Sequence, residues 1–249
     1  MIKVEYPWLP PKSNLRLSSN EVHVWRAALD QPFTHVQELS QILSDDERRR
    51  AKRFHFERDR KRFIVSHGIL RSIIGRYLSI EPSQLQFCYG LQGKPYLTEI
   101  FTDSNLRFNL AHSGELALYA FTRGREIGID LERVRTDLAC EQIAVQFFSR
   151  REITMLMAVP ESLRQKAFFD GWTRKEAFIK AIGEGLSLPL DSFDVSLSPG
   201  ESPALLQVRV DSREALHWSL RDLNLGHDYI ASLAVEGHDW QLTLWDWSK

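Results

Sequence analysis

Two carboxylates stand inside the short apolar segment "IGIDLERV", residues 127–134. Successive side chains of a β-strand point to opposite faces, so Gly128, Asp130 and Glu132 would share one face and the aliphatic residues the other. The glycine would leave open space beside the acids, and two like charges on one face repel unless water or a cation lies between them. The segment fits either a half-buried strand with one solvated face or a magnesium site, since Mg²⁺ prefers a few carboxylates together with water and phosphate oxygens.

A further acid and a lysine stand four residues apart in "WTRKEAFIK", residues 172–180. On a helix, Glu176 and Lys180 would share one face with aromatic residues. The ordinary interpretation is an i,i+4 ion pair, which contributes about 0.2–0.5 kcal/mol. The aromatic neighbours Phe169 and Trp172 indicate a partly buried position. Charged side chains lose hydration free energy there, so an ion pair with no further role would be costly. The pair could therefore also supply a base and a cation to a reaction.

Three features could bind phosphate groups. Lys94 lies in the predicted turn "GKP", and His112 and Ser113 end the strand-like segment "FNLAHSG" at a glycine. In residues 48–62, nine of fifteen residues are Lys or Arg and two are acidic, which could attract a phosphate-bearing or acidic partner. A surface lysine, a satisfied histidine and a solvated helix face are the ordinary alternatives.

The composition narrows the class of protein. Of the 249 residues, 43% are hydrophobic and 26% charged, which is typical of a globular protein with a sizeable core. The net charge of −1 and the lack of a nucleic-acid-binding motif argue against a nucleic-acid partner, and no signal pattern or membrane-length apolar run predicts membrane association. The chain has only two cysteines, Cys88 and Cys140, so no disulfide framework is indicated. We therefore expect a reducing, cytoplasmic location.

Elements in the first half can be read from local signals. A strand is predicted near residues 21–29. Ser44 and Glu47 have the spacing of a capping box, and apolar residues at helical spacing predict a long helix over about 59–78. Strand-like segments follow: "LQFCYG", "LRFNLAHS" and "ELALYAFT".

The second half repeats this order. The strand "EIGIDLERV" comes first, Ser149 and Glu152 repeat the capping-box spacing, and a long helix over about 163–182 should end at Gly183 and Gly185. Further strand-like segments follow: "FDVSL", "LLQVRV", "HWSLRDL", "YIASLAVE" and "WQLTLW".

We therefore predict an α+β fold of two similar lobes, residues 1–123 and 124–249. A site built from both halves would lie in the cleft between the lobes.

The motifs "GKP", "FNLAHSG", "IGIDLE", "WTRKEAFIK" and "GEGLSLPL" occur in this order between about residues 44 and 197. In this respect the chain resembles the 4′-phosphopantetheinyl transferases, specifically the long two-lobed type that activates peptide and polyketide synthases. The resemblance implies transfer of the phosphopantetheine arm of coenzyme A to a serine of an acyl or peptidyl carrier protein, with Mg²⁺ as cofactor and adenosine 3′,5′-bisphosphate as the other product. It also implies a pseudo-dimer of lobes within one chain, so we expect a monomer.

The resemblance assigns roles to single residues. Asp130 and Glu132 match the Mg²⁺ ligands, Glu176 matches a glutamate that completes the metal site or takes the serine proton, and Lys180 matches the lysine at the phosphate under attack. Coenzyme A phosphates are expected at Arg50, Lys94 and His112, with His112 at the 3′-phosphate.

The chain departs from the family pattern at two positions. Ala111 replaces the serine that commonly precedes the histidine, and Glu47 stands where a second lysine is frequent. Glu152 matches a central acid whose role is open. Two other functions remain to be weighed: a coenzyme A or carrier-protein binding module without turnover, and a Mg²⁺-dependent phosphodiesterase, which would normally need more metal ligands.

Overall fold

The computed structural model describes residues 6–90, 93–183 and 188–247. Residues 184–187 of the motif "GEGLSLPL", including the predicted helix stop at Gly185, lie outside them.

The first half of the chain contains six strands and three helices among the described residues. In chain order these are β1 (Trp8–Leu9), β2 (Glu21–Ala28), α1 (Phe33–Gln41), α2 (Asp45–Lys52), α3 (Glu57–Leu78), β3 (Phe87–Tyr89), β4 (Pro95–Leu97), β5 (Leu106–Ser113) and β6 (Leu116–Arg123).

The second half, in the same described part, runs through β7 (Ile127–Arg133), α4 (Cys140–Phe147), α5 (Arg150–Ala158), α6 (Glu161–Ile182), β8 (Phe193–Val195), β9 (Leu205–Val208), β10 (Trp218–Leu223), β11 (Tyr229–Glu236) and β12 (Gln241–Asp246). Short 3₁₀ helices cover Pro82–Gln84, Glu99–Ser104, Leu190–Ser192 and Glu214–His217. The mixture confirms the predicted α+β class.

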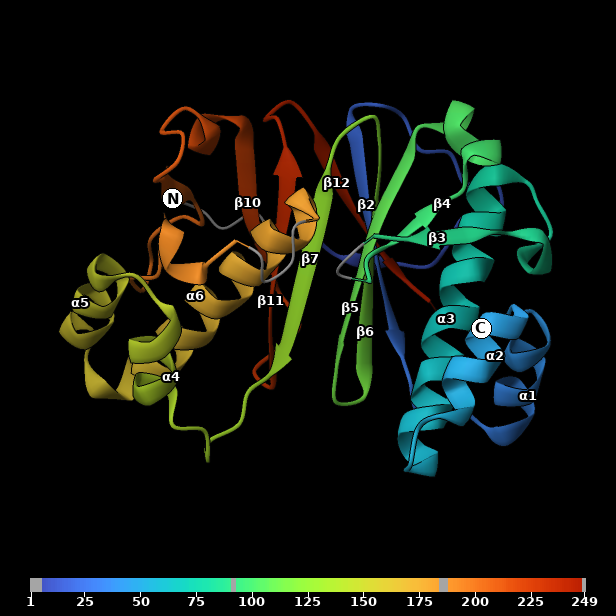
Figure 1. Ribbon diagram of the computed structural model, residues 1–249, viewed down its shortest axis with the longest axis horizontal. Coiled ribbons are helices and arrows are strands. Elements are labelled where there is room, and N and C mark those ends of the chain that lie inside the picture. Colours follow the sequence, from blue (N-terminus) through green and yellow to red (C-terminus); the bar gives the residue numbers. More distant parts are fainter. Residues whose placement is uncertain (1–5, 91–92, 184–187, 248–249) are drawn as a thin grey trace.

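Two sheets form the centre of the molecule. The first has the strand order β1-β12-β2-β6-β5 and the second the order β10-β11-β7, and two-stranded ribbons β3-β4 and β8-β9 lie beside them. Figure 1 shows the strands in the middle, with α1–α3 on one flank and α4–α6 on the other.

The strands of the first sheet are apolar on both faces because each face is covered. On β2, Trp25 and Ala27 pack in one cluster with residues of α3, whereas Val22 and Val24 pack in another with Ile129 of β7. The opposite face of the second sheet packs against α6. The layers are therefore helix, sheet, sheet and helix.

The same capping device begins the short helix ahead of each long helix. The Ser44 and Ser149 hydroxyls each accept a bond from the N–H of the glutamate three residues later, and that glutamate accepts from the serine N–H. These boxes confirm both predicted helix starts. Each glutamate is also fully buried against a cation of the long helix: Glu47 with Arg71 and Glu152 with Lys175, at 2.6 and 2.7 Å.

The structure differs from the sequence analysis in several elements. The last strand, β12, pairs in parallel with β2, so residues 241–246 lie in the first sheet although they follow the second half of the chain. Helices α1 and α4 were not predicted, because neither begins with a side-chain cap. The predicted strand at 21–29 and both long helices are present, and Gly183 ends α6 in the left-handed conformation, with φ of 77°.

Candidate active site

A cavity of about 350 Å³ lies where the two halves meet. Its lining includes residues of α2, α3, β3, β5 and α6 and of the turn before β4: Arg50, His67, Tyr89, Lys94, Asn109, Ala111, His112, Ile179, Lys180 and Gly183, with Gly93, Pro95 and Leu110. The predicted residues Arg50, Lys94, His112 and Lys180 thus lie around one space, although 130 residues separate the first from the last.

The predicted acids Asp130, Glu132 and Glu176 are not among the residues that line the cavity, and Asp130 is connected to it through Lys180. The Lys180 Nζ donates to Asp130 Oδ1 at 2.6 Å, so the lysine pairs with the strand carboxylate rather than with Glu176 on its own helix. Asp130 is 5% exposed, and its second oxygen, Oδ2, is buried with no hydrogen-bond partner in the described part of the chain. A buried carboxylate oxygen without a partner is costly and leaves a lone pair for a cation.

The three carboxylates influence one another electrostatically. Burial and the neighbouring Asp130 raise the pKa of Glu132, which a hydrogen bond from Ser113 partly offsets. Burial, Asp130 and Glu132 raise the pKa of Glu176, against the lowering effect of Lys180. Burial alone would lower the pKa of Lys180, but the acids around it outweigh burial and raise it. The site is therefore rich in negative charge that a cation would stabilise.

Close packing of α6 on β7 places these groups. A Cβ on Gly128 would lie 2.0 Å from the Ala177 carbonyl oxygen, so only glycine allows this approach. The expectation that Gly128 leaves open space beside the acids was wrong, because the backbone of α6 fills it. The acid face of β7 is covered by a helix rather than solvated.

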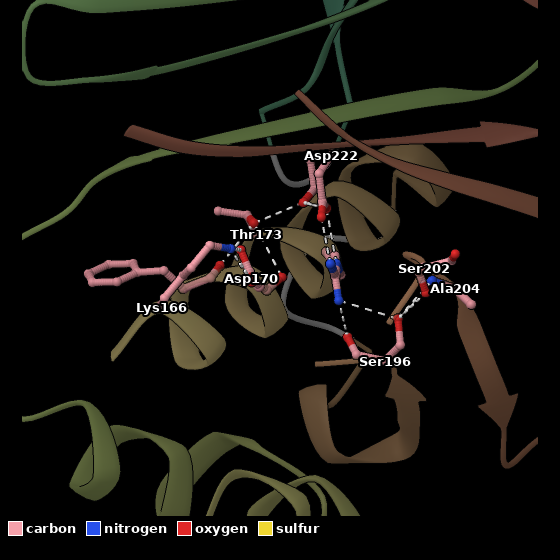
Figure 2. A network of polar contacts seen from close by, with 10 residues as sticks. Lys166, Asp170, Thr173, Ser196, Ser202, Ala204 and Asp222 are labelled. Atoms are coloured by element: carbon pink, nitrogen blue, oxygen red, sulfur yellow. Dashed lines mark hydrogen bonds and ion pairs between the residues drawn. The ribbon is translucent and has the colours of Figure 1, made fainter. Parts of the chain in front are cut away.

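A polar network fixes the same helix to strands β10 and β11 and to the segment after β8 (Figure 2). Arg174 donates two bonds to Asp222 at 3.0 and 2.6 Å, and one to the Ser196 carbonyl at 2.6 Å. The Thr173 hydroxyl lies 2.9 Å from the Ser232 hydroxyl, which donates to Asp222. These bonds hold the turn of α6 that precedes Glu176.

Arg50 and His112 enter the cavity from the first half. The Arg50 guanidinium lies over the rings of Phe63 and Tyr89, at 5.5 and 5.0 Å, and has no carboxylate partner in the described ranges. Burial, together with the positive charge of Lys180 and Arg62, lowers the pKa of His112. Both residues thus contribute to a part of the cavity that favours an anion.

Lys94 has protein partners already. Its ammonium donates to the Ala181 carbonyl at 3.0 Å and the Ile127 carbonyl at 3.4 Å, and lies 3.7 Å from Glu126. It therefore ties the turn before β4 to the end of α6 and the start of β7. An ammonium has three donors, so a phosphate at Lys94 would have to replace one of these partners, and Glu126 is the most distant of the three.

The donor set fits a magnesium ion that also binds substrate. Among the described residues, no group of three or more His, Cys, Asp and Glu side chains is arranged to hold a metal by itself. Mg²⁺ usually takes one or two carboxylates plus water and phosphate oxygens, and the unpartnered Asp130 Oδ2 beside Glu132 meets that requirement.

Three lining residues were missed from the sequence. His67 stacks on Phe63 one helical turn away, at a position that helical spacing assigns to the core. Tyr89 lies at the end of a short strand. Asn109 gave a usable signal, since it is an amide in an otherwise apolar strand.

The two departures from the family pattern, Ala111 and Glu47, take different places, and Glu152, which matches the family, has surroundings like those of Glu47. Ala111 lines the cavity but is only 5% exposed and packs in the apolar cluster between the sheets. Glu47 and Glu152 do not line the cavity. Each forms the buried ion pair with a long helix described above, Glu47 with Arg71 and Glu152 with Lys175.

Comparisons with known proteins decide the family. Residues 126–234 match the model of the 4′-phosphopantetheinyl transferase superfamily, and residues 25–123 match that of the 4′-phosphopantetheinyl transferase N-terminal region. The chain is 45% identical over 242 residues to 4′-phosphopantetheinyl transferase HetI of Nostoc sp., covering 97% of this chain and 99% of that one. The chain belongs to the 4′-phosphopantetheinyl transferase superfamily. It is also 33% identical over 171 residues to 4′-phosphopantetheinyl transferase Sfp of Bacillus subtilis, covering 68% of this chain and 74% of that one.

The predicted family and the predicted enzyme activity are confirmed by these matches. The protein is a 4′-phosphopantetheinyl transferase of the long type, so a binding module without turnover is set aside. No helix of the transferase within the described residues is long and apolar enough to cross a membrane.

Proposed function

We propose that this transferase moves the phosphopantetheine arm of coenzyme A to a serine of an acyl or peptidyl carrier protein in the cavity between its two halves. The serine oxygen would bond to the phosphorus that carries the arm. The bond from that phosphorus to the bridging pyrophosphate oxygen would break, and adenosine 3′,5′-bisphosphate would leave.

Asp130 and Glu132 are the residues to which we assign the Mg²⁺ ion. A bound Mg²⁺ supplies charge neutralisation to the pyrophosphate oxygens. Asp130 offers its unpartnered Oδ2, and Ser113 orients the carboxylate of Glu132. This buried, unpartnered oxygen beside the cavity is the observation that carries the proposal.

Glu176 and Lys180 would serve the reacting groups. The raised pKa of Glu176 makes this carboxylate a better proton acceptor for the serine hydroxyl. Glu176 would act as a ligand instead if the metal lies within its reach. Lys180 stays charged, since Asp130 raises its pKa, and can neutralise the phosphate that is attacked.

The phosphates of coenzyme A would be bound by Arg50, Lys94 and His112. Arg50 has no carboxylate partner in the described ranges, and His112 lies near the charge of Lys180. Lys94 would exchange its 3.7 Å contact with Glu126 for a phosphate. We place the 3′-phosphate at His112.

The repeated order of strand, capped short helix, long helix and strands supports a pseudo-dimer of two lobes, divided near residue 123, with the cavity as their cleft. The last strand would cross back to the first lobe. We infer a monomer that acts in the cytoplasm on coenzyme A and a carrier protein, without nucleic acid or membrane.

The test is incubation of the protein with coenzyme A, Mg²⁺ and an apo-carrier protein, followed by mass spectrometry of the carrier. A mass gain of one phosphopantetheine group, lost when the carrier serine is replaced by alanine, is expected. Cleavage of coenzyme A at the same rate without any carrier would instead favour a phosphodiesterase that uses water.

A further inference from the structure

The edge of β7 that faces the first half has backbone N–H groups without a strand partner. Even-numbered residues of this segment bond to β11: the Val134 N–H donates to Asp228, and the Glu126 carbonyl accepts from Glu236. Because backbone groups alternate along a strand, the N–H groups of Ile129 and Arg133 point the other way, toward β5. A buried N–H that lacks a partner costs free energy, so this edge has to be satisfied.

Two side chains of β5 take the place of a neighbouring strand. Asn109 Oδ1 accepts the Ile129 N–H at 2.9 Å, and Ser113 Oγ accepts the Arg133 N–H at 3.0 Å. The two acceptors stand four residues apart on β5, and so do the two donors on β7. The backbone of β5 itself is paired with β6. The edges of the two sheets are therefore joined by side chains.

The bond at Ser113 reaches a candidate metal ligand. The same hydroxyl that accepts from Arg133 donates to Glu132 Oε2 at 3.1 Å. Asp130 and Glu132 both lie between the two joined positions of β7, and His112 is the neighbour of Ser113 on β5. A shift of one strand along the other would thus change the distance between the carboxylates and the phosphate-binding side of the cavity.

We propose that Asn109 and Ser113 are positioning residues that hold β7 against β5 and orient Glu132 for the metal. The proposal rests on the proposed Mg²⁺ role of Asp130 and Glu132. Neither side chain needs to touch the metal, because Ser113 acts through the Glu132 carboxylate and Asn109 through the backbone of β7.

The experiment measures Mg²⁺ binding without turnover. Calorimetry of the full chain with coenzyme A present and no carrier protein gives the dissociation constant for Mg²⁺. Loss of a residue that orients a metal ligand typically lowers metal affinity roughly 10- to 100-fold, and this is the expected effect of Ser113→Ala on Mg²⁺ binding. Ser113→Thr, which keeps the hydroxyl, should restore binding to near the wild-type value.

Ser104→Ala is a matched control. The Ser104 hydroxyl also donates to an oxygen, the Phe101 carbonyl at 2.6 Å, and accepts a backbone N–H, that of Leu106 at 3.3 Å, but it lies at the other end of β5. Its loss should leave Mg²⁺ binding unchanged. If Ser113→Ala unfolds, Ser113→Cys keeps the volume and only weakens the bonds, and should give an intermediate dissociation constant.

A double variant shows whether Ser113 acts through Glu132. In a Glu132→Ala background, Ser113→Ala should cause little additional loss of Mg²⁺ affinity. Ser113→Ala with a dissociation constant within twofold of wild type would overturn the proposal. Wild-type protein whose coenzyme A complex binds no Mg²⁺ would instead overturn the metal assignment itself, so the two failures are distinguishable.

Asn109→Ala tests the other joined position. Because the Ile129 N–H lies one residue from Asp130, the variant should also lower the affinity for Mg²⁺. It should in addition expose the Ile129 amide to hydrogen exchange. Unchanged exchange at Ile129 would contradict the role of the Asn109 side chain.

Discussion

Replacing Asp130 by asparagine tests the centre of the site with the smallest change of shape. Asparagine keeps an oxygen that can accept from Lys180, which now donates at 2.6 Å, but it removes the negative charge and puts an amide where Oδ2 has no partner. Since Asp130 is 5% exposed, bulk water has little access to replace the lost ligand. The change therefore isolates the charge of one candidate metal ligand.

The expected loss of activity follows from the metal's contribution. A bound cation stabilises the charge of such a transition state by several kcal/mol, and each 1.36 kcal/mol is a factor of ten, so kcat/KM should fall by roughly 10²–10³. Stability without Mg²⁺ should change by less than about 1 kcal/mol, because Lys180 keeps an acceptor and one of three mutually repelling carboxylates is removed. The Mg²⁺-dependent rise in Tm expected of the wild type should be lost.

The assay is formation of holo-carrier protein at several Mg²⁺ concentrations, followed by mass spectrometry, with thermal unfolding in parallel. Asp170→Asn is the matched control, because Asp170 is also a largely buried carboxylate paired with a lysine, Lys166 at 2.6 Å, but Lys166, unlike Lys180, does not line the cavity. Transfer by Asp130→Asn within threefold of the wild type at the same Mg²⁺ would refute the metal assignment.

Three further predictions concern other parts of the chain. If Glu176 is chiefly a base, Glu176→Gln should lower kcat by roughly 10²–10⁴ while coenzyme A still binds with Mg²⁺, whereas a parallel loss of binding would identify a metal ligand. Arg50→Ala should raise the KM for coenzyme A more than the KM for the carrier protein, because the guanidinium lines the cavity; the opposite pattern would make this basic segment a carrier-docking surface. Burial lowers the pKa of His23 from 6.5 to about 4, so the unfolded chain binds a proton that the folded chain does not, and stability should fall by up to about 3 kcal/mol as pH falls from 6.5 through 4. Urea unfolding at a series of pH values should show this slope reduced in His23→Asn, and equal slopes would contradict the argument.

Local signals were sufficient for the elements that carry the site. A capping box depends on residues three positions apart, so Ser44 and Ser149 predict helix starts without reference to the rest of the fold. Alternation within "IGIDLE" likewise predicts which residues share a strand face. The motif order that predicted the family is also a property of the chain alone.

Pairings between distant residues could not be read in this way. Lys180 stands four residues from Glu176 and fifty from Asp130, yet it pairs with Asp130, because α6 lies so close to β7 that only Gly128 allows the contact. Lys94 was predicted from its turn as a phosphate ligand, and the structure gives it two backbone carbonyls of the other half.

The sequence by itself thus determined the helix starts and the strand faces, because each depends on neighbours within a few positions, and the order of its motifs gave the candidate site residues. Tertiary structure alone decided the partner of each charge, the return of β12 to the first sheet and the joining of β7 to β5 by Asn109 and Ser113. Those features depend on how two sheets and two long helices pack, and packing brings together groups that no local pattern relates.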